Sequence, residues 1–236
     1  MEYSQYNIKY QSLVRKVLQN GIWQEGRNGM TIVIPHYSFT IDDMQTDHIL
    51  RLRKMYTKGI IGEFNTLIDP TPLTNVLQFE ANGCNYWSNW SAEDGSLRLD
   101  YHDELVKQLP ELIRGIQKDP NSRRHILSLW NSKNVFNDVL SLPCCWTGMV
   151  FSVINNVLHL RWEQRSCDTM VGLPSDVYLA YLFMNYVALK TDLIVGSCMF
   201  SLSNVHIYEE HVTGAKEILN RNTEDYDKPI KFELKE

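Results

Sequence analysis

The chain has 236 residues, of which 44% are hydrophobic and 22% are charged, and its formal net charge is −5. This length and composition are typical of one globular domain with a sizeable core, so we expect a single domain over residues 1–236. The negative net charge argues against a general nucleic-acid-binding protein, which needs a large basic surface, although a few local arginines can still hold a small anion.

The first part of the chain alternates helical and extended patterns. Residues 5–20 have the apolar spacing of an amphipathic helix. The side chains expected to face inward are Ile8, Leu13, Val14 and Leu18. A Gly-Arg-Asn-Gly turn at 26–29 leads into an apolar strand at 30–35, and residues 43–62 are predicted to form a helix.

The middle of the chain is interrupted by prolines. The stretch 69–75 is predicted to be a loop or a short helix. Residues 103–117 are predicted to form a helix that Pro110 kinks or interrupts, because proline lacks the amide hydrogen used at an interior helical position. A short apolar strand is expected at 125–130.

The C-terminal part consists of strands around one apolar helix. Runs rich in β-branched residues at 146–154 and 157–163 flank Asn155-Asn156 and predict a hairpin. Residues 177–190 are too apolar for a surface helix and are predicted to be buried. Further strands are expected at 193–203 and 230–234. Together these elements predict an α+β fold with a large mixed sheet and helices on one side.

The cysteines and the N-terminus indicate a cellular compartment. The five cysteines form no CxxC pair and are odd in number, so reduced intracellular thiols are expected. The polar N-terminus does not resemble a signal peptide, and no apolar run approaches the roughly 20 residues that a membrane helix needs. We therefore expect a cytoplasmic protein with no membrane partner.

Two segments carry residues that could take part in catalysis or ligand binding. Cys144 follows a proline, which is weak evidence alone because unpaired cysteine is commonly buried in a core. The sequence QRSCD at 164–168 and a Gly-Leu-Pro turn at 172–174 follow. Arg165 could lower a thiol pKa and bind a phosphate. The alternative for Arg165 and Asp168 is a surface ion pair of little energetic weight.

The order and spacing of seven motifs resemble those of thymidylate synthases. The family patterns IIHE, IWDEW followed by NG, and DPxSRR have counterparts here. The resemblance runs from about Arg27 to His211, which is nearly the whole chain. The matching segments are IIGE at 60–63, YWSNW at 86–90 with DG at 94–95, DPNSRR at 119–124, PC at 143–144, QRSCD at 164–168, GLPS at 172–175 and HIY at 206–208.

The resemblance implies a homodimer in which one face of the sheet forms the interface. It implies transfer of a one-carbon unit from 5,10-methylenetetrahydrofolate to C5 of a pyrimidine nucleoside monophosphate, with no metal. Cys144 matches the nucleophile, whose addition at C6 makes C5 nucleophilic. A metal site at Cys144, Cys145 and Cys167 lacks the usual zinc spacing.

The resemblance also assigns ligand contacts. The expected phosphate ligands are Arg27, Arg165, Ser166, Arg123 and Arg124, the last two donated across the dimer interface. Without the motif, Arg123 and Arg124 would be two solvated charges. Glu63 matches the acid/base at the ring, and Tyr101 matches a tyrosine near the thiolate. The remaining matches are His206 and Tyr208 at the sugar 3′-hydroxyl, Asp168 at the pterin, and Trp87 and Trp90 at the folate, where core packing is the alternative for either tryptophan.

Asp176 is the most informative departure from the family pattern. Thymidylate synthases have asparagine there, and its amide reads uracil. An ionised carboxylate only accepts hydrogen bonds, which suits the 4-amino group and a protonated N3 of cytosine. In this the chain resembles deoxycytidylate hydroxymethylases. The alternative is an aspartate favoured as a helix N-cap.

Two further departures concern the C-terminus and Cys145. The sequence ends with KFELKE at 231–236, where thymidylate synthases continue and use their last residues to exclude water. A shorter lid favours addition of water and hence a hydroxymethyl product. Cys145 stands where the family usually has histidine, with no predicted direction of effect.

The predicted function is therefore conversion of dCMP, methylenetetrahydrofolate and water to 5-hydroxymethyl-dCMP and tetrahydrofolate. The alternatives are a dCMP 5-methyltransferase, an enzyme acting on CMP or dUMP, and a nucleotide-binding module without turnover. The presence of Cys144 and Glu63 argues against the last. The resemblance implies a phage enzyme that works in bacterial cytoplasm.

Overall fold

The computed structural model describes residues 4–26, 28–135 and 140–222. Its centre is a seven-stranded mixed sheet in the order β1-β2-β7-β5-β4-β3, with β6 paired to β7. The strands are β1 (Ile22–Gly26), β2 (Gly29–Ile41), β3 (Ile126–Ser128), β4 (Trp146–Ile154), β5 (Val157–Gln164), β6 (Cys167–Asp168) and β7 (Ile194–Tyr208). Strands β5 and β6 run parallel to β7, and the other pairings are antiparallel.

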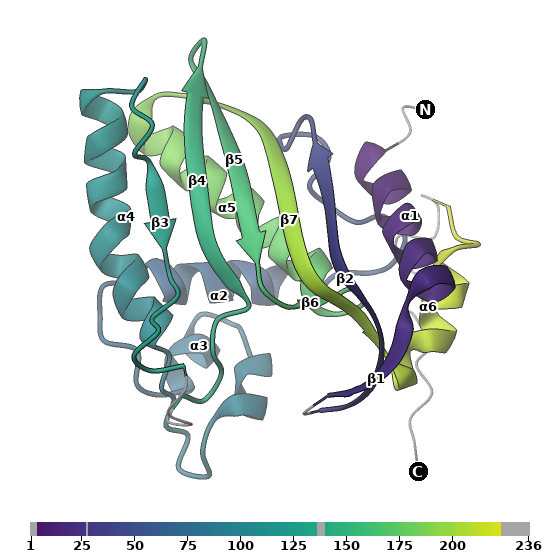
Figure 1. Ribbon diagram of the computed structural model, residues 1–236. Coiled ribbons are helices and arrows are strands. Elements are labelled where there is room, and N and C mark those ends of the chain that lie inside the picture. The colour runs from purple at the N-terminus through teal and green to yellow at the C-terminus, as the bar shows by residue number, and fades with distance from the viewer. Residues whose placement is uncertain (1–3, 27, 136–139, 223–236) are drawn as a thin grey trace.

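Helices cover one side of this sheet, so the predicted α+β architecture is confirmed (Figure 1). Helices α2 and α5 lie behind the central strands, α4 lies beside β3, and α1 and α6 lie near β1 and β2. The helices are α1 (Gln5–Asn20), α2 (Thr57–Ile68), α3 (Leu77–Ala81), α4 (Asp100–Lys118), α5 (Gly172–Thr191) and α6 (Val212–Ile218), with short 3-10 helices η1 (Tyr86–Trp90) and η2 (Glu209–His211). Among the described residues, no helix combines the length and the apolar character needed to cross a membrane.

The helix-covered face of the sheet holds the core. Because side chains alternate between the two faces of a strand, partners in the register share a face. One row across this face is formed by Phe39, Phe200, Trp162 and Met149, all of which are buried. The rings of Phe39 and Phe200 stack with centroids 5.0 Å apart. Helix α5 packs here and is buried along most of its length, as predicted.

The opposite face of the sheet is more exposed. The next row in the same register contains Met199, Arg161, Val150 and Ile126. Met199 is 40% exposed and Ile126 is 50% exposed. Apolar side chains on an exposed sheet face are typical of a surface that meets another molecule.

The β4–β5 hairpin confirms the prediction at Asn155-Asn156. Both residues have positive φ, 50° and 64°. A two-residue turn with both φ values positive matches the right-handed twist of the strands, and asparagine tolerates this conformation better than most residues.

The predicted helix at 43–62 is wrong in its first half, because helix α2 begins only at Thr57. The Asp43 carboxylate accepts hydrogen bonds from the Gln45 amide and the Thr46 hydroxyl. Such local side-chain bonds compete with helix formation. The Met44 amide also donates to the Gly196 carbonyl of β7, which holds this segment against the sheet.

Several other boundaries differ from the predictions. Ile8 is 51% exposed, because the buried face of α1 runs through Tyr6, Tyr10, Leu13 and Val17. Helix α4 passes through Pro110 without interruption. Strand β7 continues to Tyr208, well past the predicted end. The strand predicted at 230–234 lies outside the described residues.

Candidate functional site

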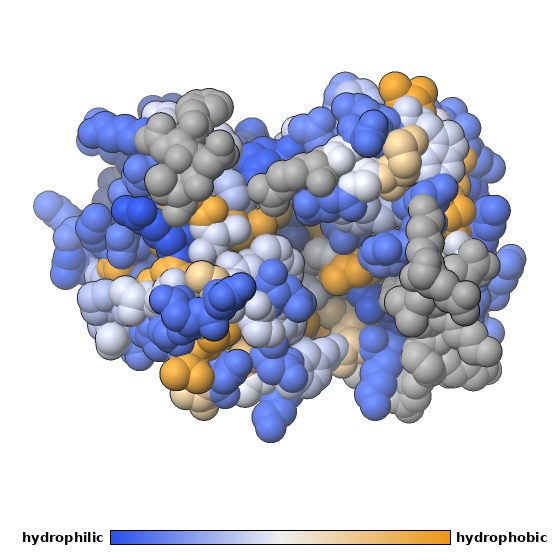
Figure 2. Space-filling model, turned by 90° about the horizontal axis from the view of Figure 1, so that it is seen from below, coloured by the Kyte–Doolittle hydropathy of each residue, from blue (hydrophilic) through white to orange (hydrophobic). Residues whose placement is uncertain are grey.

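A cavity of about 840 Å³ opens at the end of the sheet where β7 and the β1–β2 hairpin project. Figure 2 shows the molecule from this end, with its surface hollowed between two lobes. The cavity contains every described residue that the sequence predicted for the site except Arg123 and Arg124. These residues are Glu63, Trp87, Trp90, Tyr101, Cys144, Arg165, Ser166, Asp168, Asp176, His206 and Tyr208.

Cys144 lies just before β4 and is only 3% exposed. Its Sγ lies 3.7 Å from the Leu129 carbonyl oxygen. Burial raises the pKa of the Cys144 thiol to about 12, although the nearby Arg165 charge acts to lower it. The expected lowering by Arg165 is therefore present but is outweighed by desolvation. A thiol with a pKa in this range is protonated at neutral pH.

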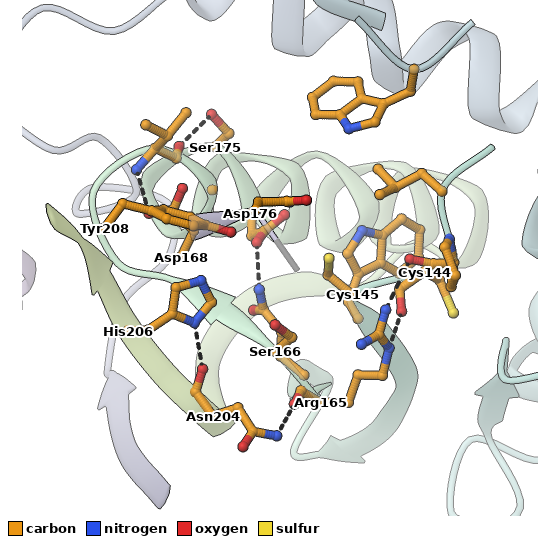
Figure 3. A pocket seen from close by; sticks show the side chains of 18 of the residues that line it. Cys144, Cys145, Arg165, Ser166, Asp168, Ser175, Asp176, Asn204, His206 and Tyr208 are labelled. Carbon is orange, nitrogen blue, oxygen red and sulfur yellow. Dashed lines mark hydrogen bonds between the residues drawn. The ribbon is translucent and has the colours of Figure 1, made fainter. Parts of the chain in front are cut away.

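Arg165 is fastened to the backbone that carries the thiol. Its Nε donates to the Cys144 carbonyl at 2.8 Å, and its Nη2 donates to the Pro143 carbonyl at 3.1 Å. The guanidinium also lies 5.2 Å from the ring centroid of Trp130. These contacts leave a fixed cation at the cavity wall (Figure 3), as a phosphate site requires. A surface ion pair with Asp168 does not describe this arrangement.

Glu63 projects from α2 and is held by two donors from η1. The Tyr86 hydroxyl donates to Oε2 at 2.5 Å, and the Trp87 indole donates to Oε1 at 3.0 Å. Burial raises the pKa of Glu63, while these two hydrogen bonds act to lower it. A Cβ at Gly62 would lie 2.4 Å from the Asn82 carbonyl oxygen. Glycine at this position, where the family pattern has histidine, thus lets α2 approach the turn that leads into η1.

Asp176 lies in the first turns of α5 with its carboxylate against β5. Its Oδ2 accepts from Gln164 Nε2 at 2.7 Å, and Gln164 Oε1 accepts from the Trp162 indole at 3.3 Å. Because an indole nitrogen only donates, the Gln164 amide must direct its NH₂ group at Asp176. Burial raises the pKa of Asp176 well above its usual range, and the charges of Glu63 and Asp168 act in the same direction. Capping does not explain this aspartate, since the N-cap residue of α5 is Val171.

Asp168 and the end of β7 form the next wall (Figure 3). Asp168 Oδ1 accepts from the amides of Met170 and Val171, at 2.9 and 3.2 Å, and so orders the turn before α5. His206 Nδ1 contacts the Asn204 carbonyl at 2.7 Å, and its ring meets Tyr208 edge-on with centroids 5.1 Å apart. The extension of β7 beyond its predicted end is what brings this histidine and tyrosine to the cavity.

The two tryptophans of η1 play different parts. Trp87 is 4% exposed and stacks on Phe79 with centroids 4.8 Å apart, so core packing accounts for most of its surface. Trp90 is 37% exposed and meets Trp87 edge-on with centroids 5.3 Å apart. Tyr101 is buried at the start of α4, where its ring meets Trp146 edge-on. Trp90 therefore offers the more open aromatic surface.

Two predicted phosphate ligands do not join this group. Arg123 and Arg124 are exposed in the segment before β3 and are not among the described residues that line the cavity. Arg27 lies outside the described residues. Within the described ranges, no cluster of His, Cys, Asp or Glu side chains is arranged to hold a metal ion.

Among the cavity residues that were not singled out from the sequence, three make contacts that shape the site. Gln164 lies within the QRSCD motif, and Tyr86 precedes the first tryptophan of YWSNW. Asn204 has a positive φ of 45° and donates from Nδ2 to the Arg165 carbonyl at 2.9 Å, which ties β7 to the segment after β5. Their positions in motifs could have indicated Gln164 and Tyr86 as site residues. Asn204 could not be found in this way, because its place depends on a backbone conformation.

Comparison with known proteins is consistent with this arrangement. The family model described as thymidylate synthase matches residues 8–235. Curated relatives include the thymidylate synthases of Buchnera aphidicola subsp. Acyrthosiphon pisum strains Tuc7, 5A and APS. Each is 28% identical to this chain over 224 residues, which cover 90% of this chain and 83% of the relative.

Proposed function

The chain belongs to the thymidylate synthase family, and we propose that it converts dCMP to 5-hydroxymethyl-dCMP. The family performs folate-dependent modification of a pyrimidine nucleotide at C5, using methylenetetrahydrofolate as co-substrate. The choice of dCMP rests on one observation, the contact of Gln164 with Asp176 where the family pattern has asparagine.

The hydrogen-bonding pattern of Asp176 suits cytosine. Gln164 directs its NH₂ group at Oδ2, so this oxygen accepts and the rest of the carboxyl is left for the base. A protonated carboxyl can donate to N3 of cytosine and accept from its 4-amino group. An ionised carboxylate can accept from the 4-amino group and from a protonated N3, which thiolate addition at C6 favours. Asp176 can therefore pair with cytosine whether its carboxyl is protonated or ionised.

Cys144 is proposed to begin the reaction. Its deprotonated Sγ forms a bond to C6, and the electron pair of the C5–C6 bond lets C5 form a bond to the one-carbon unit. Loss of the C5 proton and of tetrahydrofolate leaves an exocyclic methylene on C5. Water adds its oxygen to this carbon and passes a proton to Glu63. The electron pair then re-forms the C5–C6 bond and expels Cys144 as a thiolate, so that C5–H has become C5–CH₂OH.

The remaining predicted residues are proposed as binding groups. Arg165 and Ser166 hold the phosphate together with Arg27, and His206 and Tyr208 hold the sugar. Tyr101 lies near the attacking thiol. Trp87, Trp90 and Val171 line the cavity with aromatic and apolar surface, and the Asp168 carboxylate also lines it. Such a lining suits a flat pterin whose N–H groups need an acceptor.

The first test is mass spectrometry of products after incubation with methylenetetrahydrofolate and, separately, dCMP, CMP and dUMP. We expect dCMP to gain one CH₂O. A gain of one CH₂ would instead identify a dCMP methyltransferase in which hydride from the folate reduces the methylene. Product from CMP alone would show that the substrate is a ribonucleotide. Product from dUMP alone would contradict the role of Asp176 in reading cytosine. Since the aspartate resembles that of deoxycytidylate hydroxymethylases, we propose that the protein is encoded by a phage and works in the cytoplasm of the host bacterium.

Members of this family are generally dimers, and we propose that the exposed sheet face forms the interface. Ile126 and Met199 supply apolar surface on this face, which no described helix covers. Arg123 and Arg124 lie just before β3, whereas Leu129, just after β3, contacts the Cys144 thiol through its carbonyl. These arginines are therefore at the far end of β3 from their own thiol, and we propose that they bind the phosphate in the partner's cavity.

Subunit mixing tests this proposal. Arg124→Ala and Cys144→Ser should each be inactive as homodimers. Their heterodimer should contain one cavity with both an intact thiol and an intact arginine, so random mixing should restore about a quarter of the wild-type activity. The control mixes Cys144→Ser with the double variant Arg124→Ala/Cys144→Ser, in which no intact cavity can form. If heterodimers verified by native mass spectrometry stay inactive, the shared site is wrong.

A further inference from the structure

Tyr86 makes a contact with Glu63 that its sequence motif does not predict. The family pattern has isoleucine at this position, which cannot donate a hydrogen bond. Here the phenol donates to Glu63 Oε2 at 2.5 Å. The neighbouring Trp87 indole donates to the other oxygen at 3.0 Å. Both oxygens of the carboxyl therefore face a donor from η1.

The Tyr86 ring packs against α2. A Cβ at Gly59 would lie 2.3 Å from the Tyr56 ring and 3.1 Å from Tyr86 Cε1, so glycine lets both tyrosine rings lie against this helix. Tyr86 is half-buried and Cys84 interacts with its hydroxyl from the buried side. The tyrosine thus contacts α2 and Cys84 as well as Glu63.

The arrangement favours the ionised form of Glu63. The indole can only donate, so Oε1 must accept, and a carboxylate with a donor at each oxygen is stabilised as an anion. Burial opposes this and raises the pKa of Glu63, and the Tyr86 and Trp87 hydrogen bonds limit the rise. Without the phenol, desolvation would be opposed by one donor fewer.

We propose that Tyr86 is a positioning residue that holds Glu63 ionised and correctly oriented as the base that accepts a proton from water. The inference rests on the proposed function in one respect, which is that water is the source of the proton that Glu63 accepts. The contact itself concerns residues of this chain alone. A merely structural tyrosine would support the fold of η1 without influencing the titration of Glu63.

The first experiment measures the titration of Glu63 directly. Protein labelled with ¹³C at the glutamate carboxyl carbons is titrated by NMR, and the Glu63 signal is assigned from its loss in Glu63→Gln. In Tyr86→Phe, the titration midpoint of Glu63 should move to higher pH. The matched control is Tyr56→Phe, because the Tyr56 phenol lines the same cavity and donates to the Gly83 carbonyl at 3.1 Å rather than to a carboxylate. Its Glu63 midpoint should equal that of the wild type.

The second experiment measures product formation from dCMP between pH 5 and 9. Loss of a hydrogen bond to a charged group corresponds to about a tenfold change. Tyr86→Phe should therefore be about tenfold slower than the wild type at the acidic end, with the two rates converging at high pH and with KM for dCMP unchanged. Tyr86→Ile, which restores the family residue, should show the same change in the pH–rate profile. It replaces Tyr86→Phe in the test if the phenylalanine variant folds poorly.

The two experiments separate the two claims. An unchanged Glu63 midpoint in both Tyr86 variants would overturn the positioning role. A shifted midpoint with an unchanged pH–rate profile would overturn its importance for catalysis. A shifted midpoint in a protein that is inactive on every nucleotide would leave the Tyr86–Glu63 contact standing and contradict the proposed function instead.

Discussion

Replacing Cys144 with serine is expected to reduce product formation by at least about a thousandfold while preserving nucleotide binding. A serine hydroxyl is far less acidic than a thiol, and this position already disfavours an anion. Burial raises the pKa of the thiol to about 12 even with Arg165 nearby. A serine there would have almost no alkoxide available to attack C6. Mass spectrometry of the product and isothermal titration calorimetry with dCMP measure the two quantities.

The adjacent thiol provides the control for this prediction. Cys145 lines the same cavity, so Cys145→Ser makes the same chemical change one residue away. We expect that variant to keep turnover and to form a covalent adduct with a C5-substituted dCMP analogue. Equal activity of Cys144→Ser and wild type would end the covalent mechanism. Loss of activity only in Cys145→Ser would move the nucleophile to that residue.

Replacing Asp176 with asparagine is expected to lower the ratio of kcat/KM for dCMP to that for dUMP by at least about a hundredfold. A site that hydrogen-bonds one base leaves buried groups unpaired when the other base binds, and such mismatches give large discrimination. The Gln164 amide would orient the asparagine oxygen toward itself and its NH₂ group toward the ring. That donor suits O4 of uracil. Steady-state kinetics with both nucleotides measures the ratio.

Asp168→Asn is the matched control, because it makes the same change in a second carboxylate of the same cavity. It should lower activity with both nucleotides by weakening folate binding, and should leave their ratio unaltered. If Asp176→Asn also leaves the ratio unaltered, Asp176 does not read the base.

The pH dependence of the wild-type enzyme gives an independent check on Asp176. Burial raises the pKa of this carboxyl well above its usual range. Below that pKa the protonated carboxyl can both donate and accept, so it can match uracil as well as cytosine. Above it the carboxylate repels O4 of uracil but still accepts from the amino group of cytosine. The preference for dCMP over dUMP should therefore increase as the pH rises through the pKa of Asp176.

Much of the site follows from the sequence because its residues belong to motifs. The order of PC, QRSCD, GLPS and HIY indicated the family and most of the side chains that the structure brings to one cavity. The Asn155-Asn156 hairpin and the buried α5 were also predictable, since both depend on short-range patterns. The helix predicted at 43–62 failed where Asp43 and a bond from Met44 to β7 replace helical hydrogen bonds.

The sequence by itself determined the family and the departure at Asp176, and it predicted Cys144 as the nucleophile, because each is a matter of residue type in a recognisable order. Only the tertiary structure decided the chemical state of these groups. The donors that face Glu63 and Asp176 come from η1 and β5, and the high pKa of Cys144 arises from burial by distant segments. Desolvation and hydrogen-bond partners depend on how remote parts of the chain pack together, and local sequence patterns carry little information about that packing.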